Sequence, residues 1–208
     1  MAETMQAPPP VRAEAVSQAG RGTAWAFTIT GLVGLAAAFT LLVEKIALLK
    51  DPAYVPSCSI NPVLSCGSVM NTEQAAAFGF PNPILGVAGF TALLTIGVVL
   101  LTRATLPGWF WWGIQAGTTF GVVFVHWLIF QSLYRIEALC PYCMVVWIAV
   151  IAAFVAATAQ NATSGRLPLP PPTKDIGSYA PSVVTVWLVL IAGLILVQFW
   201  DYWVTLRR

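Results

Sequence analysis

Four long stretches of this chain contain no Asp, Glu, Lys or Arg, and they limit what the chain can fold into. They are residues 74–102, 104–134, 138–165 and 176–200. A helix that crosses a lipid bilayer needs about 20 mostly apolar residues, so each stretch can hold one crossing. Only 9% of the chain is charged, whereas soluble domains average about 25%. The sequence therefore predicts an integral membrane protein.

The apolar stretches and the prolines between them predict five helices, at about 24–49, 83–102, 109–134, 141–159 and 182–203. Asp51-Pro52 ends the first, because proline disfavours a helical residue before it. The expected fold is an all-α membrane protein. It has a four-helix transmembrane core at 24–160, a short helical loop outside the cytoplasm, and a fifth transmembrane helix within 182–208. We expect a disordered tail at 1–23 and a Pro-rich linker at 161–181.

The four cysteines form two sequence pairs, Cys58 with Cys66 and Cys140 with Cys143, each where a polar stretch meets an apolar one. Between the pairs the predicted chain crosses the membrane twice, so both pairs are expected on the same side. Lys and Arg divide equally between the two sides and leave the orientation open. We place the cysteines outside and the N-terminus in the cytoplasm, because disulfides persist in oxidising compartments.

Cys140-Pro141-Tyr142-Cys143 is a C-x-x-C motif at the start of the fourth predicted span. Proline suits the first helical position, which makes Cys140 the N-cap and places Cys143 in the first turn. The partial positive charge of a helix N-terminus lowers the pKa of a thiol there. A thiol with a lowered pKa is a good leaving group, so the motif is suited to thiol–disulfide exchange.

The segment around Cys58 and Cys66 is predicted to form short helices over the mouth of the bundle. Asn61-Pro62 predicts the start of a helix that carries Cys66. A second short helix is expected at about 72–78, ending at a glycine. This loop could bring Cys66 close to Cys140. A bond between those two and both within-pair disulfides are all feasible.

Two other classes of protein compete with redox chemistry. Buried cysteines in apolar helices can be inert, and four thiolates in two pairs can bind zinc. The alternative function is therefore a non-catalytic membrane protein with structural or zinc-binding cysteines. We expect no metal, because the short spacing usual for zinc occurs only once. A DsbB-like oxidase is disfavoured, because such proteins keep their C-x-x-C in the first external loop.

Together these motifs resemble the vitamin K epoxide reductase family. The resemblance rests on C-x7-C at 58–66, on Phe78-Gly79 and Asn82, and on the C-x-x-C that opens a later span. It covers roughly residues 25–160. It implies a bacterial, quinone-dependent thiol–disulfide oxidoreductase of the inner membrane, with menaquinone or ubiquinone as acceptor. The implied partner is a separate DsbA-type thioredoxin-fold protein, and no nucleic acid is expected.

The resemblance also implies roles for individual residues. Cys143 would face the quinone, with Cys140 as its disulfide partner. Cys66 would exchange with Cys140, and Cys58 would meet the partner protein. Animal members carry Tyr where this chain has Trp147, which can stack on a quinone but lacks the hydroxyl; we therefore expect quinone rather than epoxide reduction. The expected quinone-binding residues are Thr72, Phe78, Asn82 and Trp147.

Three further features are expected to be structural. Glu44 and Lys45 lie near the end of the first span, where their side chains can reach the membrane interface. His126 is expected to be neutral and bonded to a neighbouring helix, although an ionisable residue within a membrane can also relay protons. A double G-x-x-x-G ladder at 113–121 is expected to pack closely against another helix.

Overall fold

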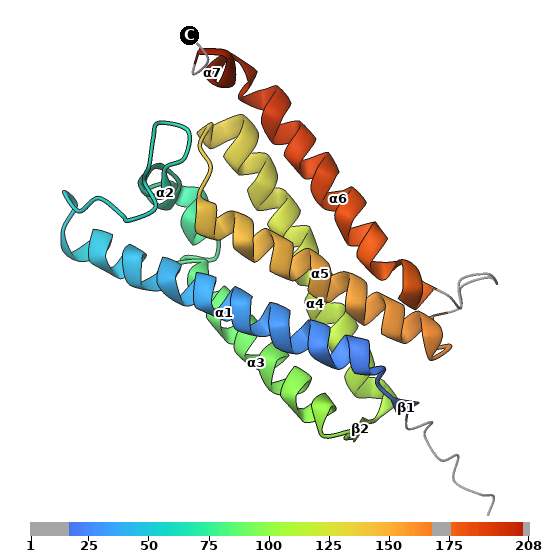
Figure 1. The fold of residues 1–208 in the computed structure, drawn as a ribbon. Coiled ribbons are helices and arrows are strands. Elements are labelled where there is room, and N and C mark those ends of the chain that lie inside the picture. The colour runs from blue at the N-terminus through green and yellow to red at the C-terminus, as the bar shows by residue number, and fades with distance from the viewer. Residues whose placement is uncertain (1–16, 168–175, 206–208) are drawn as a thin grey trace, which may run out of the picture.

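Helices cross the molecule side by side in the structure, a computed structural model that describes residues 17–167 and 176–205. Within these residues five helices are long and apolar enough to span a membrane, which confirms the predicted all-α membrane class. Four of them form a bundle, and the fifth, α6, lies along its outside against α5 (Figure 1). The five are α1 (Arg21–Lys50), α3 (Pro83–Leu101), α4 (Gly108–Gln131), α5 (Pro141–Thr163) and α6 (Ile176–Gln198).

The helix ends differ from the prediction by a few residues. α5 continues to Thr163 rather than 159, and α6 begins at Ile176 rather than 182. Pro181 lies inside α6, where its missing N–H costs the helix one internal hydrogen bond without ending it. A π-helical turn, η2 (Ser132–Ile136), extends α4, and a short helix, α7 (Trp200–Thr205), follows α6.

Residues 1–16 of the predicted tail and 168–175 of the predicted linker lie outside the described residues. The ends of the predicted linker belong to α5 and α6. α1 begins at Arg21 rather than 24. Before it, β1 (Ser17–Gln18) pairs antiparallel with β2 (Thr105–Leu106) in the link between α3 and α4. This pairing joins the N-terminal segment to the end of the bundle opposite α2 (Figure 1).

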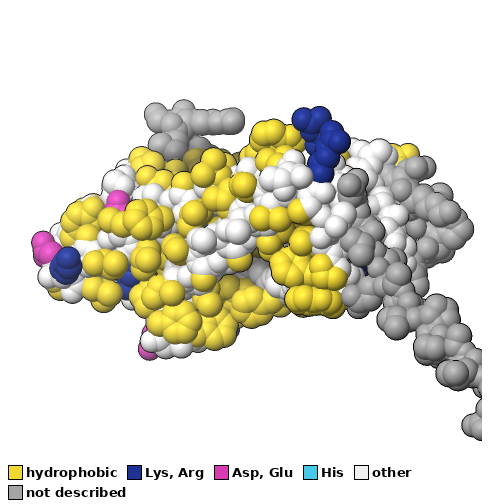
Figure 2. Space-filling model, turned by 90° about the horizontal axis from the view of Figure 1, so that it is seen from below, with side chains coloured by type: hydrophobic (Ala, Val, Ile, Leu, Met, Phe, Trp, Pro, Cys, Tyr) yellow, Lys and Arg dark blue, Asp and Glu magenta, His cyan; other side chains and the backbone are white. Residues whose placement is uncertain are grey.

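The outer surface of the bundle is apolar. Figure 2 shows hydrophobic side chains over the middle of one face, with the visible acidic and basic groups towards its ends. Large apolar residues such as Phe39 on α1 and Val123 on α4 are more than half exposed. Lipid is the environment that satisfies such a surface, because the hydrocarbon region of a bilayer accepts apolar side chains without cost.

Glycines allow α1 and α3 to pack very closely. A Cβ added at Gly97 of α3 would lie 2.5 Å from the backbone N of Thr28, and one at Gly31 of α1 would lie 2.6 Å from that of Leu94. Real Cβ atoms do not approach backbone this closely. The contact between the two helices therefore requires glycine at both positions, as in small-residue packing of membrane helices.

The predicted glycine ladder on α4 has a different role from the one expected. An added Cβ would meet nothing within 4 Å at Gly113 or Gly117, and both residues line an internal cavity. Only at Gly121 does it approach another helix, 3.3 Å from a methyl group of Val150 on α5. The packing prediction is therefore wrong for Gly113 and Gly117, because α4 faces open space where a neighbouring helix was expected.

Candidate redox site

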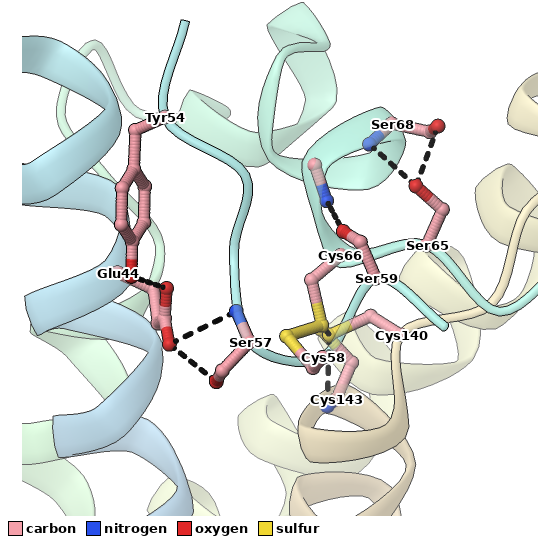
Figure 3. The surroundings of a disulfide bond; sticks show 11 residues. Glu44, Tyr54, Ser57, Cys58, Ser59, Ser65, Cys66, Ser68, Cys140 and Cys143 are labelled. Carbon is pink, nitrogen blue, oxygen red and sulfur yellow. Dashed lines mark hydrogen bonds between the residues drawn. A yellow bond between two sulfur atoms is a disulfide. The ribbon is translucent and has the colours of Figure 1, made fainter. Parts of the chain in front are cut away.

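All four cysteines lie at one end of the bundle, as the count of crossings predicts. Cys58 and Cys66 form a disulfide, while Cys140 and Cys143 are free thiols. The sulfur of Cys140 lies 2.8 Å from that of Cys66 (Figure 3). Of the three pairings left open by the sequence, the structure contains Cys58–Cys66, with Cys140 in direct contact with it.

Two backbone hydrogen bonds hold the segments that carry Cys66 and Cys140 in register. The N–H of Ser65 donates to the carbonyl of Leu139 at 2.9 Å, and the N–H of Leu139 donates to the carbonyl of Val63 at 2.7 Å. These bonds form an isolated parallel bridge between two parts of the chain that are distant in sequence. Cys140 directly follows Leu139, and Cys66 directly follows Ser65, whose N–H makes one of the two bonds, so the bridge sets the position of both sulfurs.

The helix that carries Cys66 starts later than predicted. α2 (Cys66–Met70) begins after Ser65, whose hydroxyl accepts from the N–H of Ser68 at 3.2 Å and caps the helix. Asn61 instead caps a turn, because its Oδ1 accepts from the N–H groups of Val63 and Leu64 at 3.0 and 2.7 Å. The prediction of a helix start at Asn61-Pro62 is wrong, since the backbone of 63–65 is used in the turn and the bridge.

The second short helix of the loop is close to its predicted place. It is a 3-10 helix, η1 (Glu73–Ala76), and Gly79 adopts a positive φ of 81° after it. This backbone conformation favours glycine, so Gly79 ends the segment as predicted. The loop then enters α3 through Asn82.

Cys140 is the N-cap of α5, and Pro141 opens the helix, as the motif predicts. The N–H of Cys143 points to the Cys140 sulfur at 3.5 Å. The pKa of Cys140 is lowered, first by a hydrogen bond from the Cys143 thiol and then by the backbone N–H groups of Cys143 and Tyr142, against the opposing effect of burial. Cys140 is therefore the thiol of this pair that more readily carries the negative charge.

An internal cavity of about 500 Å³ reaches the redox site. α1, α3, α4, α5 and the loop before α3 line it, and Cys143 is its one cysteine. Most of the wall is apolar, including Phe90 and Ile114. Apart from Thr118 in the middle of α4, its polar side chains gather at the end near the cysteines: Lys45, Thr72, Gln74, Asn82, Gln131 and Ser132. The size and this apolar lining with a few polar groups are typical of a site for a small organic molecule.

Three of the four predicted quinone-binding residues line this cavity. Trp147 is 3% exposed. Asn82 accepts from the N–H of Ala77 and donates to the carbonyl of Gln74, so its amide also shapes the loop. Thr72 donates to the carbonyl of Val69. Phe78 is half exposed and lies outside the cavity wall, although its ring packs on two residues that line the cavity, Phe120 and Phe124.

Glu44 and Lys45, near the end of α1, both contact the loop that follows this helix. The side chain of Glu44 is only 7% exposed. Its carboxylate accepts hydrogen bonds from Tyr54 and Ser57, just before Cys58 (Figure 3). Lys45 lines the cavity and donates to the carbonyl of Met70, the last residue of α2, at 2.7 Å. In the sequence, two adjacent charges after a long apolar run were the feature that could have indicated inward-facing polar contacts here.

His126 has the structural role that the sequence favours. Its Nδ1 donates to the carbonyl of Val122 at 2.7 Å, and its Nε2 accepts from the indole N–H of Trp187 at 2.9 Å. This arrangement requires the neutral ring. The hydrogen bond between Trp187 and His126 joins α6 to α4. His126 therefore helps to hold the fifth long helix against the bundle.

The sulfurs of Cys58, Cys66 and Cys140 lie within 4.8 Å of one another, close enough for one metal ion. The thiolate, however, is the form that binds metals. In this structure two of the three sulfurs are bonded to each other. A metal would therefore compete with the disulfide for the same atoms.

The chain matches known proteins at the level of a family. A model of the vitamin K epoxide reductase family matches residues 25–158, which include every cysteine and nearly all of the four helices of the bundle. A search among curated proteins finds no match.

Proposed function

Because the chain belongs to the vitamin K epoxide reductase family, whose members are membrane thiol–disulfide oxidoreductases, we propose that it oxidises the dithiol of a separate DsbA-type thioredoxin-fold protein and reduces a quinone. The observation that carries the proposal is the 2.8 Å contact between the sulfurs of Cys66 and Cys140. It joins the disulfide of the loop to the C-x-x-C motif, whose second cysteine lines the cavity.

Two exchange steps move the disulfide from the C-x-x-C motif to the loop. The Cys66 thiolate attacks the sulfur of Cys140, the Cys140–Cys143 bond breaks, and Cys143 leaves and takes up a proton. The Cys58 thiolate then attacks Cys66, and Cys140 leaves as a thiolate. The second step produces the pattern in this structure: a Cys58–Cys66 disulfide beside two free thiols. The lowered pKa of Cys140 favours it as the leaving group.

The cavity fits a quinone in chemistry and in shape. A quinone bound there accepts the two electrons and two protons released when Cys140 and Cys143 form their disulfide again. Asn82 and Lys45 keep further N–H donors at the polar end of the cavity, Thr72 offers its hydroxyl oxygen as an acceptor, and Trp147 offers a ring for stacking. The wall follows α4 from Trp109 to Gln131, which at 1.5 Å per residue is about 33 Å. This length suits a quinone with a polyprenyl tail, either menaquinone or ubiquinone.

The test uses purified protein in lipid nanodiscs, a reduced DsbA-type protein and a short-chain quinone. We expect quinone absorbance to fall as the partner becomes oxidised, and Cys143→Ala to lower the rate at least about a hundredfold, because the disulfide facing the cavity cannot form. Partner oxidation by Cys143→Ala at the wild-type rate would refute the electron path. A stoichiometric metal in the purified wild-type protein would instead favour the zinc alternative.

The same protein tests the order of the exchange steps. Cys58→Ala removes the thiol that resolves the Cys66–Cys140 bond, so that bond should accumulate when the partner is omitted. Mass mapping of non-reduced peptides reads it directly. If Cys58→Ala contained no Cys66–Cys140 disulfide, the 2.8 Å contact would not be the transfer step.

A further inference from the structure

Glu44 places a buried carboxylate next to the loop that carries Cys58. Its side chain is 7% exposed and accepts three hydrogen bonds: from the Ser57 hydroxyl at 2.6 Å, the Ser57 N–H at 3.4 Å and the Tyr54 hydroxyl at 2.9 Å (Figure 3). The bond to Glu44 also raises the pKa of Tyr54, which keeps its hydroxyl protonated as a donor. All three donors come from the four residues before Cys58.

These bonds attach the segment 54–57 to the bundle. The other polar contacts of this segment that the structure shows are local: the N–H of Tyr54 donates to Asp51, and the N–H of Ser59 donates to Pro56. Hydrogen bonds to an ionised carboxylate are about twice as strong as those between neutral groups. Glu44 therefore supplies the main polar attachment between α1 and this segment.

The attached loop hides the sulfur that a partner must reach. Cys58 is 5% exposed and Cys66 is 0% exposed. Thiol–disulfide exchange requires the attacking sulfur to touch the sulfur it attacks. A protein partner therefore cannot reach Cys58 while the segment is attached to Glu44. The internal contact between Cys66 and Cys140 is held separately, by the bridge between Leu64 and Leu139.

We propose that Glu44 is a positioning residue that controls when Cys58 becomes accessible: with 54–57 attached, Cys58 is covered, and with 54–57 released, Cys58 faces the partner. The inference rests on the proposed function, in which Cys58 meets an external dithiol. In the released state a partner thiolate attacks Cys58, the Cys58–Cys66 bond breaks, and Cys66 leaves as a thiolate. The partner's second thiolate then attacks the partner sulfur that is bonded to Cys58. This mixed disulfide breaks, Cys58 leaves as a thiolate, and the partner now contains a disulfide.

The first test measures access to Cys58 without a quinone or a protein partner. Reduced glutathione is added to the oxidised protein, and the loss of the Cys58–Cys66 disulfide is followed by mass mapping. Glu44→Ala should accelerate this reduction at least about tenfold, because it removes the acceptor of three bonds. Asp51→Asn is the matched control: its carboxylate accepts from Ala53 within the same loop and does not touch the bundle. Its rate should equal that of the wild type.

The donors of the loop provide the second test, which applies even if Glu44→Ala fails to fold. Tyr54→Phe and Ser57→Ala should each accelerate reduction by about threefold. Each loop substitution is then repeated in a Glu44→Gln protein, which keeps one acceptor oxygen but no charge. The acceleration by Tyr54→Phe or Ser57→Ala should be smaller there than in the wild type, because the donor and Glu44 act through the same hydrogen bond. Full additivity, or wild-type rates in both loop variants, would overturn the proposal.

A third measurement separates control of access from general loosening of the structure. Labelling of Cys143 by an apolar maleimide reports on the cavity, and it should be unchanged in Tyr54→Phe and Ser57→Ala. Faster labelling of Cys143 in parallel with faster reduction would show that the whole site has loosened and would overturn a specific role for Glu44. Because glutathione replaces the partner and no quinone is present, these results do not depend on whether the chain reduces a quinone.

Discussion

Cys140 takes part in both of the proposed exchange steps, and its surroundings fit that use. It is fully buried, caps α5 and touches Cys66. The motif alone predicted the cap and the direction of the pKa change, because both arise within four consecutive residues. The contact with Cys66 comes from the bridge between Leu64 and Leu139. The predicted residues Thr72, Asn82 and Trp147 lie at the cavity, and their contact with a quinone stays a prediction.

The pH dependence of Cys140 reactivity should reveal its hydrogen bond with Cys143. Since the folded protein lowers the pKa of Cys140, its thiolate should persist below the ordinary thiol value of about 8.5. The Cys140 thiolate stabilises the fold fully at pH values above the thiol's pKa in the unfolded chain. This stabilisation is lost as the pH falls through the lowered pKa of Cys140 in the folded protein.

The rate at which methyl methanethiosulfonate converts Cys140 to its methyl disulfide, read at this site over a range of pH, measures this midpoint. Cys143→Ala should move it to higher pH, because the first cause of the shift is removed. Cys143→Ser keeps a hydroxyl donor and should stay closer to the wild type. Equal midpoints in the alanine and serine variants would contradict this account of the pKa.

At the scale of the helices, glycines divide into those that allow packing and those that leave space. The sequence indicated a glycine ladder on α4 but could not show what faces it. The close contact instead joins Gly31 and Gly97 to the backbone of the opposite helix. A G-x-x-x-G pattern identifies a smooth helix face, and the position of the neighbouring helices decides whether that face packs or lines a cavity.

Alanine substitutions should separate the two kinds of glycine. Gly97→Ala places a methyl group 2.5 Å from the backbone N of Thr28, and such overpacking should cost about 1–3 kcal/mol of unfolding free energy. Gly113→Ala meets no atom within 4 Å, and it should be neutral or stabilising by up to about 1 kcal/mol. Denaturant unfolding in bicelles measures both. A loss of stability in Gly113→Ala as large as in Gly97→Ala would contradict the packing described here.

For the whole molecule, the main consequence is that the bundle has one redox end. The four cysteines and the polar end of the cavity lie there, whereas β1 and β2 lie at the other end (Figure 1). A relay of disulfides requires this arrangement, because sulfurs on opposite sides of a bilayer cannot exchange.

Labelling from one side of the membrane tests this arrangement. Lys50 ends α1 near the cysteines, Thr102 follows α3 at the other end, and both are exposed. In spheroplasts, an impermeant maleimide should label Lys50→Cys and leave Thr102→Cys unlabelled until the membrane is opened, if the redox end faces away from the cytoplasm as we propose. Labelling of both variants in intact spheroplasts would contradict the transmembrane arrangement.

The sequence by itself determined the membrane class, the five spans, the shared side of the cysteine pairs and the cap at Cys140. These features depend on local composition and on residues adjacent in the chain. Tertiary structure decided which sulfurs are in contact, where the cavity lies, and that Glu44 turns inward to the Cys58 loop. Those depend on segments far apart in the chain, such as 63–65 and 139, whose approach is set by the packing of helices that no short stretch of sequence describes.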